Sequence, residues 1–254
     1  MNNIKIVIPA RYASSRLYGK PLLMLAGKPM IQHSYERAVD ADLGEIVIAT
    51  DDQRIFDVCV GFGATVCMTK ETHQTGSDRL SEVVEKYSWD DNTIIVNLQG
   101  DEPLTPISCL QQVAANLAKN NEASIATLAT PIQSDAEYNN PNAVKVVFDR
   151  NGYALYFSRA AIPYQRDENQ ENDDFAYRHL GIYAYRAGFL KDFVKMDACP
   201  IEQLEKLEQL RAMWNGKRIH VAVAEDVPGH GVDTKEDLLV VEKILSRGIL
   251  KPKL

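Results

Sequence analysis

The amino-acid sequence predicts an α/β fold built on a mostly parallel central sheet, with a smaller region of mixed strands. Apolar runs of strand length recur through the first half of the chain, and a segment with helical spacing of apolar residues follows each of them. After Asn120 this alternation stops, although strand-like runs continue. The sequence contains no internal repeat and no low-complexity linker, so we expect a single domain over residues 1–254.

Parallel strands joined by crossover helices are expected in the first half. Near-continuous apolar side chains, typical of strands covered on both faces, mark the strands at residues 4–8, 45–49, 65–68 and 93–98. The helices between and after them are expected at residues 30–39, opened by Pro29, and at 53–60, 77–87 and 106–117. Leu80, Val83 and Val84 share one face of the third helix. This repeating order of strand and helix predicts a doubly wound core.

Mixed strand pairing is expected in the second half of the chain. Its strand-like runs, at residues 124–131, 144–148, 154–157 and 180–185, are not each followed by a long helix. Two helices, at 201–214 and 234–246, flank a strand at 219–224. Residues 165–174 are polar and acidic, and we expect them to form an exposed loop.

Composition narrows the class of function. The chain has 254 residues, 45% of them hydrophobic, and a formal net charge of -7 at pH 7. This acidic balance argues against nucleic acid or an anionic membrane as a partner, because such proteins present a basic surface to phosphates. The four cysteines never form a Cys-x-x-Cys pair, so we expect reduced thiols in the core. No apolar signal segment or membrane-length run is present in the sequence, which predicts a cytoplasmic protein.

A basic loop follows the first strand, where open α/β sheets bind their ligands. After Pro9 and Ala10 it contains cations and hydroxyls, namely Arg11, Ser14, Ser15, Arg16 and Lys20. Arginine presents a fork of donors that fits phosphate oxygens, and lysine is a compact point charge. The loop therefore predicts a phosphate site, with a solvated basic turn as the alternative. It is not a Walker P-loop, because Gly19 and Lys20 are followed by proline.

Two aspartates are candidate magnesium ligands. Asp101 follows the fourth strand, so it emerges at the same sheet edge as the basic loop. Magnesium prefers one or two protein carboxylates together with substrate phosphates and water. Asp233 precedes the last helix and supplies a second carboxylate. The alternatives are an Asx turn at Asp101 and a helix cap at Asp233, and spacing alone favours the cap.

Three further polar segments are candidates for binding. Residues 72–79 lead into a helix N-terminus, which suits an anion or the polar edge of a base. Residues 178–183 place two donors and a phenol beside a strand. Glu208 and Arg211 are predicted to share a helix face with Leu204 and Leu207, either as an i,i+3 pair or as the wall of a polar pocket. The five histidines show no metal-ligand spacing.

Taken together, a series of motifs in order along the chain resembles the 3-deoxy-manno-octulosonate cytidylyltransferase family, which makes CMP-Kdo. They are PARYASSRLYGKPL, ATDD, HQTGSDRL, VNLQGDEP, NAVKVV, ALYFSRAAIP, RHLGIYAYR, LEKLEQLR and GVDTKEDL. ATDD and GVDT are unspecific, whereas RHLGIY with LEQLR and the basic loop is a highly specific combination. The resemblance implies a Rossmann-like nucleotide-diphospho-sugar transferase fold and a homodimer. Residues 1–120 would bind the nucleotide and residues 121–230 the sugar and the partner subunit, with 234–246 as a closing helix.

The resemblance also implies roles for individual residues. Lys20 and Arg11 are implied to be catalytic and to hold the triphosphate. The implied nucleotide-binding residues are Pro9, Ala10, Arg11, Ser14, Ser15, Arg16, Lys20, Ser77, Arg79 and Asp101. Those around the sugar acid are Gln99, Arg159, His179, Tyr183, Glu208 and Gln209, and the magnesium ligands are Asp101 and Asp233. Tyr18 stands where the family usually has proline, which removes a constraint on φ but no charge.

The expected reaction is magnesium-dependent attack by the anomeric hydroxyl of 3-deoxy-D-manno-octulosonate (Kdo) on the α-phosphorus of CTP, for lipopolysaccharide assembly. Positioned cations and metal would supply most of the catalysis. One alternative is a cytidylyltransferase for 8-amino-Kdo or an acylneuraminate. The other is a non-catalytic nucleotide-binding regulator, which the pair of metal carboxylates disfavours.

Overall fold

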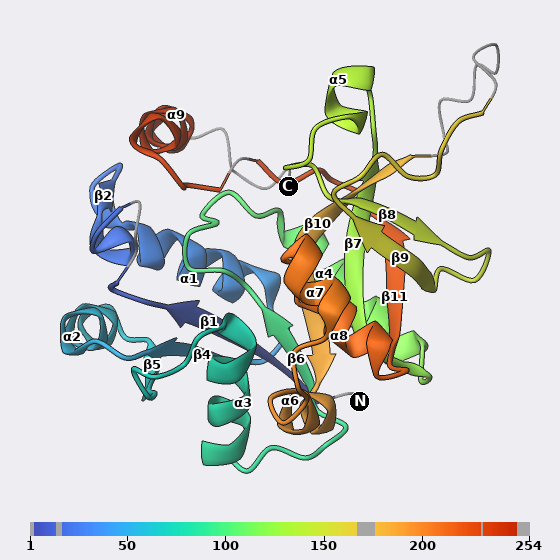
Figure 1. Cartoon of the computed structure of the whole chain (residues 1–254). Coiled ribbons are helices and arrows are strands. Elements are labelled where there is room, and N and C mark those ends of the chain that lie inside the picture. The colour runs from blue at the N-terminus through green and yellow to red at the C-terminus, as the bar shows by residue number, and fades with distance from the viewer. Residues whose placement is uncertain (1–2, 14–16, 167–175, 230, 248–254) are drawn as a thin grey trace.

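The computed structural model describes residues 3–13, 17–166, 176–229 and 231–247 (Figure 1). The strands are β1 (Ile4–Ala10), β2 (Met24–Leu25), β3 (Lys28–Pro29), β4 (Glu45–Thr50), β5 (Thr65–Met68), β6 (Ile94–Asn97), β7 (Ala123–Pro131), β8 (Lys145–Phe148), β9 (Ala154–Ser158), β10 (Tyr177–Arg186) and β11 (Arg218–Val223). The helices are the 3-10 turn η1 (Lys20–Leu22), α1 (Met30–Ala41), α2 (Gln53–Gly61), α3 (Gly76–Lys86), α4 (Ile107–Lys119), α5 (Asp135–Tyr138), α6 (Ala187–Phe193), α7 (Pro200–Glu205), α8 (Gln209–Trp214) and α9 (Lys235–Ser246).

One sheet runs through both halves of the chain. Its main path is β11-β7-β10-β6-β1-β4-β5, and β8 and β9 continue from β10. The pairs on either side of β1 are parallel, as are β4 with β5 and β7 with β11. β10 is antiparallel to both β6 and β7, and the β8–β9 hairpin is antiparallel too. The predicted α/β class, with a mostly parallel centre and a smaller mixed region, is confirmed, and the mixed strands extend the same sheet.

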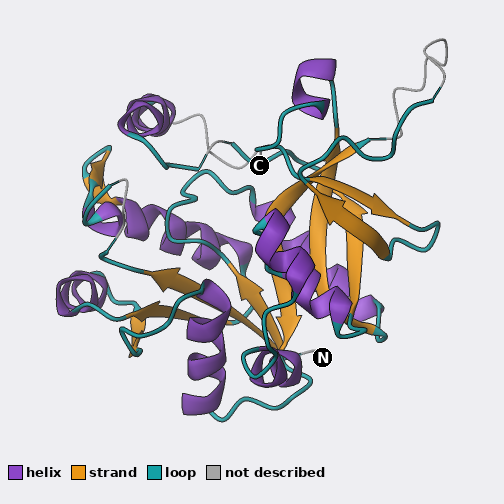
Figure 2. Cartoon of the chain, viewed as in Figure 1, coloured by secondary structure: helices purple, strands orange, loops and turns teal. Residues whose placement is uncertain are grey.

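Helices cover both faces of this sheet (Figure 2). Side chains of β1 alternate between the faces, so Ile6 and Ile8 pack in one cluster and Val7 in the other. The first cluster includes buried residues of α1, α2 and α4, and the second those of α3, α6 and α8. The doubly wound core is therefore confirmed, and it leaves the carboxyl ends of the parallel strands open for loops.

The predicted helix at residues 201–214 is wrong, because the structure divides it into α7 and α8. Lys206 ends α7 in the left-handed region with φ 53°, so the helix cannot continue through it. The break also removes the predicted shared face: Leu204 is 83% exposed, whereas Leu207 is buried. Five short elements, η1, β2, β3, α5 and α6, were not predicted, because so few residues show no clear apolar period.

All four cysteines are free and buried, which confirms the predicted core thiols. Among the described residues, none of the helices has the length and apolarity that crossing a membrane requires.

Candidate active site

A cavity of about 410 Å³ lies at the carboxyl ends of β1 and β6. Its lining residues are Pro9, Ala10, Arg11, Ala13, Lys20, Pro21, Gly76, Gln99, Gly100, Asp101 and Asp233. Because β1 and β6 are parallel neighbours, the loops that follow them leave the sheet at one edge. At Gly100 a Cβ would lie 2.9 Å from Cδ1 of Ile31 and 3.1 Å from the carbonyl oxygen of Pro9, so a larger residue there would have to push against α1 and β1.

Lys20 lies between the two aspartates predicted to bind metal. Its ammonium nitrogen Nζ is 2.5 Å from Oδ2 of Asp101 and 3.0 Å from Oδ1 of Asp233. These partners are 81 and 213 residues away in the sequence. Thr234, not Asp233, caps α9 through a capping box with Asp237, so the expected helix cap is one residue away. The structure thus brings Lys20, Asp101 and Asp233 together at one point.

Arg11 also lines the cavity and is anchored by a backbone oxygen. Its Nη2 donates a hydrogen bond of 2.7 Å to the carbonyl oxygen of Gln74. Burial and the nearby Arg79 guanidinium lower the pKa of Arg11, although Asp51, Asp78 and Glu208 act in the opposite direction. Burial therefore disfavours the charged form of this guanidinium, and an anion bound in the cavity would offset that effect.

Arg79 is not among the residues that line this cavity, and it is fully buried. Its Nη2 is 2.6 Å from Oδ2 of Asp51 and its Nη1 donates to the hydroxyl of Thr69. Its Nε has no hydrogen-bond partner among the described residues. Arg79 therefore joins α3 to the ends of β4 and β5, and its predicted contact with the nucleotide stays a prediction.

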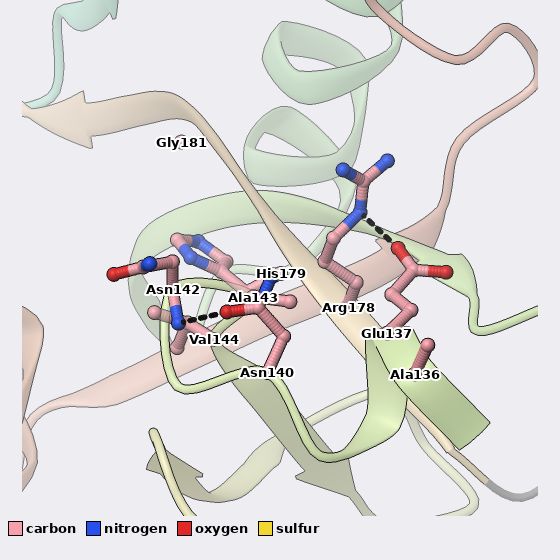
Figure 3. Close-up of a pocket in the computed structure, with 9 residues that line it drawn as sticks. All are labelled: Ala136, Glu137, Asn140, Asn142, Ala143, Val144, Arg178, His179 and Gly181. Carbon is pink, nitrogen blue, oxygen red and sulfur yellow. Dashed lines mark hydrogen bonds and ion pairs between the residues drawn. The ribbon is translucent and has the colours of Figure 1, made fainter. Parts of the chain in front are cut away.

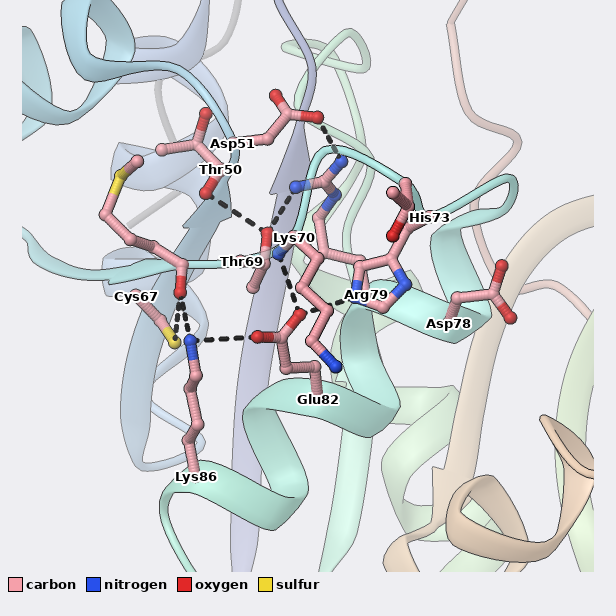
Figure 4. Close-up of polar contacts among 12 residues, drawn as sticks. Thr50, Asp51, Cys67, Thr69, Lys70, His73, Asp78, Arg79, Glu82 and Lys86 are labelled. Atoms are coloured by element: carbon pink, nitrogen blue, oxygen red, sulfur yellow. Dashed lines mark hydrogen bonds and ion pairs between the residues drawn. The ribbon is translucent and has the colours of Figure 1, made fainter.

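Glu82 ties the loop between β5 and α3 to the helix (Figure 4). Its carboxylate accepts hydrogen bonds from the amide of Lys70 at 2.9 Å, from Nε2 of His73 at 2.5 Å and from Nζ of Lys86 at 2.9 Å. Burial alone would raise the pKa of Glu82, but the bonds from Lys86, Lys70 and His73 outweigh burial and lower the pKa to about 2. This loop carries the Gln74 carbonyl that anchors Arg11.

Replacing Glu82 with glutamine is expected to make the free energy of unfolding depend less on pH at acidic pH. Because the folded-state pKa of about 2 is below the ordinary 4.5, the carboxylate stabilises the fold fully above pH 4.5 and loses that effect as the pH falls toward 2. In urea unfolding, the difference in stability between the parent and Glu82→Gln should therefore shrink between pH 7 and pH 3. Glu85→Gln, at an exposed position of the same helix, is the control. A constant difference would contradict the electrostatic role.

Ser77, predicted to bind the nucleotide, and Glu208, predicted to bind the sugar acid, are hydrogen-bonded to each other. The hydroxyl of Ser77 donates to Oε2 of Glu208 at 3.1 Å, across 131 residues of sequence. Arg211 Nη2 lies 3.2 Å from Oε1 of Glu208 and 3.0 Å from Oε1 of Glu202. Burial raises the pKa of Glu208, although bonds from Thr75 and Ser77 and the charge of Arg211 act against it. Of the two predicted arrangements, the i,i+3 pair of Glu208 and Arg211 is thus present.

His179 and Tyr183 lie in a row of aromatic rings along β10. The ring centroids of Phe157 and His179 are 5.0 Å apart, those of His179 and Tyr183 5.3 Å, and those of Tyr183 and Tyr185 5.6 Å. Burial lowers the pKa of His179 to about 3, so its imidazole is neutral near pH 7. Its Nε2 lies 2.9 Å from the hydroxyl of Thr127, where a neutral ring can donate or accept.

The remaining predicted sugar-side residues lie just after β9, at the start of α8 and just after β6. Arg159 follows β9, and its Nε donates to the carbonyl oxygen of Glu205 at 2.6 Å and its Nη1 to that of Pro141 at 2.9 Å. Gln209, at the start of α8, is 8% exposed, and its Nε2 has no hydrogen-bond partner among the described residues. Gln99 lines the first cavity instead.

A second cavity, of about 590 Å³, lies beside β10 and α5 (Figure 3). His179 is the predicted site residue among its lining residues, which are Ala136, Glu137, Asn140, Asn142, Ala143, Val144, Arg178, His179 and Gly181. Arg178 Nε and Glu137 Oε1 are 3.0 Å apart across its wall.

Ser14, Ser15 and Arg16 lie outside the described residues. Tyr18, the departure from the family pattern, is 71% exposed, and its ring meets the Tyr12 ring edge-on with centroids 4.8 Å apart.

Sequence reasoning missed three features of the site. The Gln74 carbonyl has no side-chain signal, because every residue has a carbonyl. Asp51 and Thr69 were not assigned, although the Asp51-Asp52 pair directly after a strand could have pointed to Asp51. Glu102, next to Asp101, was also missed: burial, and then the charge of Asp101, raise its pKa to about 7.

Comparison with known proteins shows the family to which the chain belongs. The cytidylyltransferase family model matches residues 5–219. The 3-deoxy-manno-octulosonate cytidylyltransferase of Haemophilus influenzae (strain PittEE) is 54% identical over 250 residues, covering 95% of this chain and 98% of the relative. The protein of the same name from Thioalkalivibrio sulfidiphilus (strain HL-EbGR7) is 54% identical over 247 residues, covering 96% and 99%.

Solved structures show the same fold. A structure of CMP:2-keto-3-deoxy-manno-octonic acid synthetase complexed with CTP is 41% identical, covers 97% of this chain and 100% of its own, and superposes with a TM-score of 0.90. A 4-diphosphocytidyl-2C-methyl-D-erythritol synthase is only 13% identical, with a TM-score of 0.65, and shares the fold alone.

Proposed function

Because this chain belongs to the 3-deoxy-manno-octulosonate cytidylyltransferase family, we propose that it transfers CMP from CTP to Kdo and releases pyrophosphate. The identity of 54% over 95% of the chain supports this activity, as does the likeness to a synthetase complexed with CTP. The observation that carries the proposal is the convergence of Lys20, Asp101 and Asp233 in a cavity that Arg11 also lines.

In this reaction the anomeric oxygen of Kdo forms a bond to the α-phosphorus of CTP, and the bond from that phosphorus to the bridging oxygen of the leaving pyrophosphate breaks. The hydroxyl proton leaves to solvent. Negative charge grows on the phosphoryl oxygens, so groups that are positive and already in place lower the barrier. Among the described residues that line the cavity, the cations are Arg11, fixed by the Gln74 carbonyl, and Lys20.

Magnesium is the cofactor that the donor set fits. Two carboxylates from different loops converge on one cation, here an ammonium, which shows that their geometry accepts a positive charge between them. No group of three or more His, Cys, Asp or Glu side chains suited to a metal occurs within the described ranges, so further ligands would be phosphate oxygens and water, as magnesium prefers. When bound, the metal would neutralise phosphate charge and lower the pKa of the attacking hydroxyl.

The sugar acid is proposed to lie against Gln99, Arg159, His179, Tyr183, Glu208 and Gln209. A guanidinium such as that of Arg159 suits the Kdo carboxylate, and the unpaired Nε2 of Gln209 suits a hydroxyl. A neutral His179 adds a hydrogen-bonding group without a second charge. The Ser77–Glu208 bond supports the placing of this group next to the nucleotide.

The substrates are tested by pyrophosphate release from each nucleoside triphosphate, with Kdo, 8-amino-Kdo or N-acetylneuraminate, and with or without magnesium. We expect release with CTP, Kdo and magnesium together. If pyrophosphate is released faster with 8-amino-Kdo or N-acetylneuraminate than with Kdo, that sugar and not Kdo is the acceptor. If the protein binds CTP but releases no pyrophosphate with any sugar, the result would favour a non-catalytic nucleotide-binding regulator.

We further propose a homodimer, with the nucleotide held by residues 1–120 and the sugar acid and partner subunit by residues 121–230. Leu155 on β9 and Tyr164 support an interface there, since they are large side chains 62% and 85% exposed. A cytoplasmic location and a role in lipopolysaccharide assembly are proposed with it, and four free thiols suit a reducing compartment. Sedimentation equilibrium tests the dimer, which a monomer at every concentration would contradict.

A further inference from the structure

Lys20 occupies a place that the proposed function gives to a metal. In that function the Lys20 ammonium binds the triphosphate, and the carboxylates of Asp101 and Asp233 bind magnesium. Here the ammonium instead bridges both carboxylates, at 2.5 Å and 3.0 Å. The Lys20 side chain is only 8% exposed, whereas those of Asp101 and Asp233 are 39% and 51% exposed, so a buried ammonium meets two carboxylates that solvent reaches.

The carboxylates are held near each other by contacts that do not involve Lys20. The amide of Val232 donates to the carbonyl oxygen of Asp101 at 3.0 Å, which joins the two loops through their backbones. The amide of Asp233 is held in turn by Oδ2 of Asp237, at 3.0 Å, at the start of α9. Removing the ammonium therefore takes a positive charge from between two carboxylates that stay near each other, which favours the binding of another cation there.

We propose that Lys20 is a resident counter-ion of the metal site, which a divalent cation displaces so that the ammonium becomes available to the triphosphate. This inference rests on the proposed function. An ammonium and a divalent cation repel each other strongly at such distances, so the carboxylates hold one or the other. Metal and nucleotide then favour each other's binding, because metal entry releases the cation that the phosphates need.

Lys20 should therefore weaken metal binding to the nucleotide-free protein, although it serves catalysis. Lys20→Met keeps the length of the side chain and removes its charge. We expect it to bind Mn²⁺ about tenfold or more tightly than the parent, as measured by electron paramagnetic resonance of free Mn²⁺ without nucleotide. Lys20→Arg keeps the charge and should bind no more tightly than the parent. Lys28→Met, which removes the ammonium paired with Glu36, is the matched control and should leave the affinity unchanged.

Equal Mn²⁺ affinities of Lys20→Met and the parent would overturn the proposal. If Asp101→Asn and Asp233→Asn bind Mn²⁺ like the parent, the metal site of the proposed function is wrong, which is a separate result. If Lys20→Met does not fold, nuclear magnetic resonance of the lysine ammonium groups in the unaltered protein decides the matter. The Lys20 signal should change when magnesium is added without nucleotide, and an unchanged signal at saturating magnesium would overturn the displacement.

Discussion

Asp101→Asn is expected to lower turnover about 10²- to 10³-fold at a fixed magnesium concentration, the range seen when one stabilising group is removed from a transition state. The substitution keeps the shape of the side chain and removes one of the two carboxylates that face the cation position. Magnesium affinity should fall with it, so a magnesium titration of pyrophosphate release should move to higher concentrations. The KM for Kdo should change little, because the sugar-side groups are untouched.

The control for this experiment is Asp40→Asn. Asp40 lies near the end of α1 and pairs at 3.8 Å with Arg37, on the helix and not at the cavity. Its magnesium titration should match that of the parent. If the titrations of Asp101→Asn and the parent also coincide, Asp101 is structural and the proposed metal site is refuted.

The largest loss of stability is expected from Asp51→Asn. Asp51 is the charged partner of Arg79, whose side chain is fully buried and whose Nε already has no partner among the described residues. Removing one partner of a buried ion pair leaves the other charge uncompensated and costs about 3 kcal/mol or more. For a chain of this size we expect the Tm to fall by roughly 6 to 12 °C in calorimetry.

The control for Asp51→Asn is Asp91→Asn, which also removes an aspartate from an ion pair with a similar distance between its charged atoms. Asp91 lies 2.8 Å from Lys191, but its side chain is 73% exposed, so its loss should cost less than about 1 kcal/mol. Comparable shifts in Tm for the two variants would show that burial of Arg79 does not decide the energy. A normal Tm for Asp51→Asn would mean that Arg79 is compensated by Thr69 alone.

The sequence predicted the sheet edge on which the site is built. Strands β1 and β6 are continuous apolar runs, and the polar residues that end them, Arg11 and Gln99, had to emerge at the same edge once both strands were parallel. The sequence did not predict the division between α7 and α8. Its apolar spacing was compatible with one helix, and the left-handed conformation of Lys206 has no sequence signal as strong as glycine.

The sequence alone determined which functional side chains are present and in which order they follow along the chain. Parallel pairing followed from runs of apolar residues, and the family from motifs spread over nearly the whole chain. Only the tertiary structure decided which charges meet. Lys20 reaches Asp101 and Asp233 across 81 and 213 residues, and Ser77 reaches Glu208 across 131. Such contacts depend on strand order and on how loops leave the sheet, which local periodicity does not encode. The basic loop therefore predicted a phosphate site, whereas its lysine lies on the two carboxylates proposed to bind the metal.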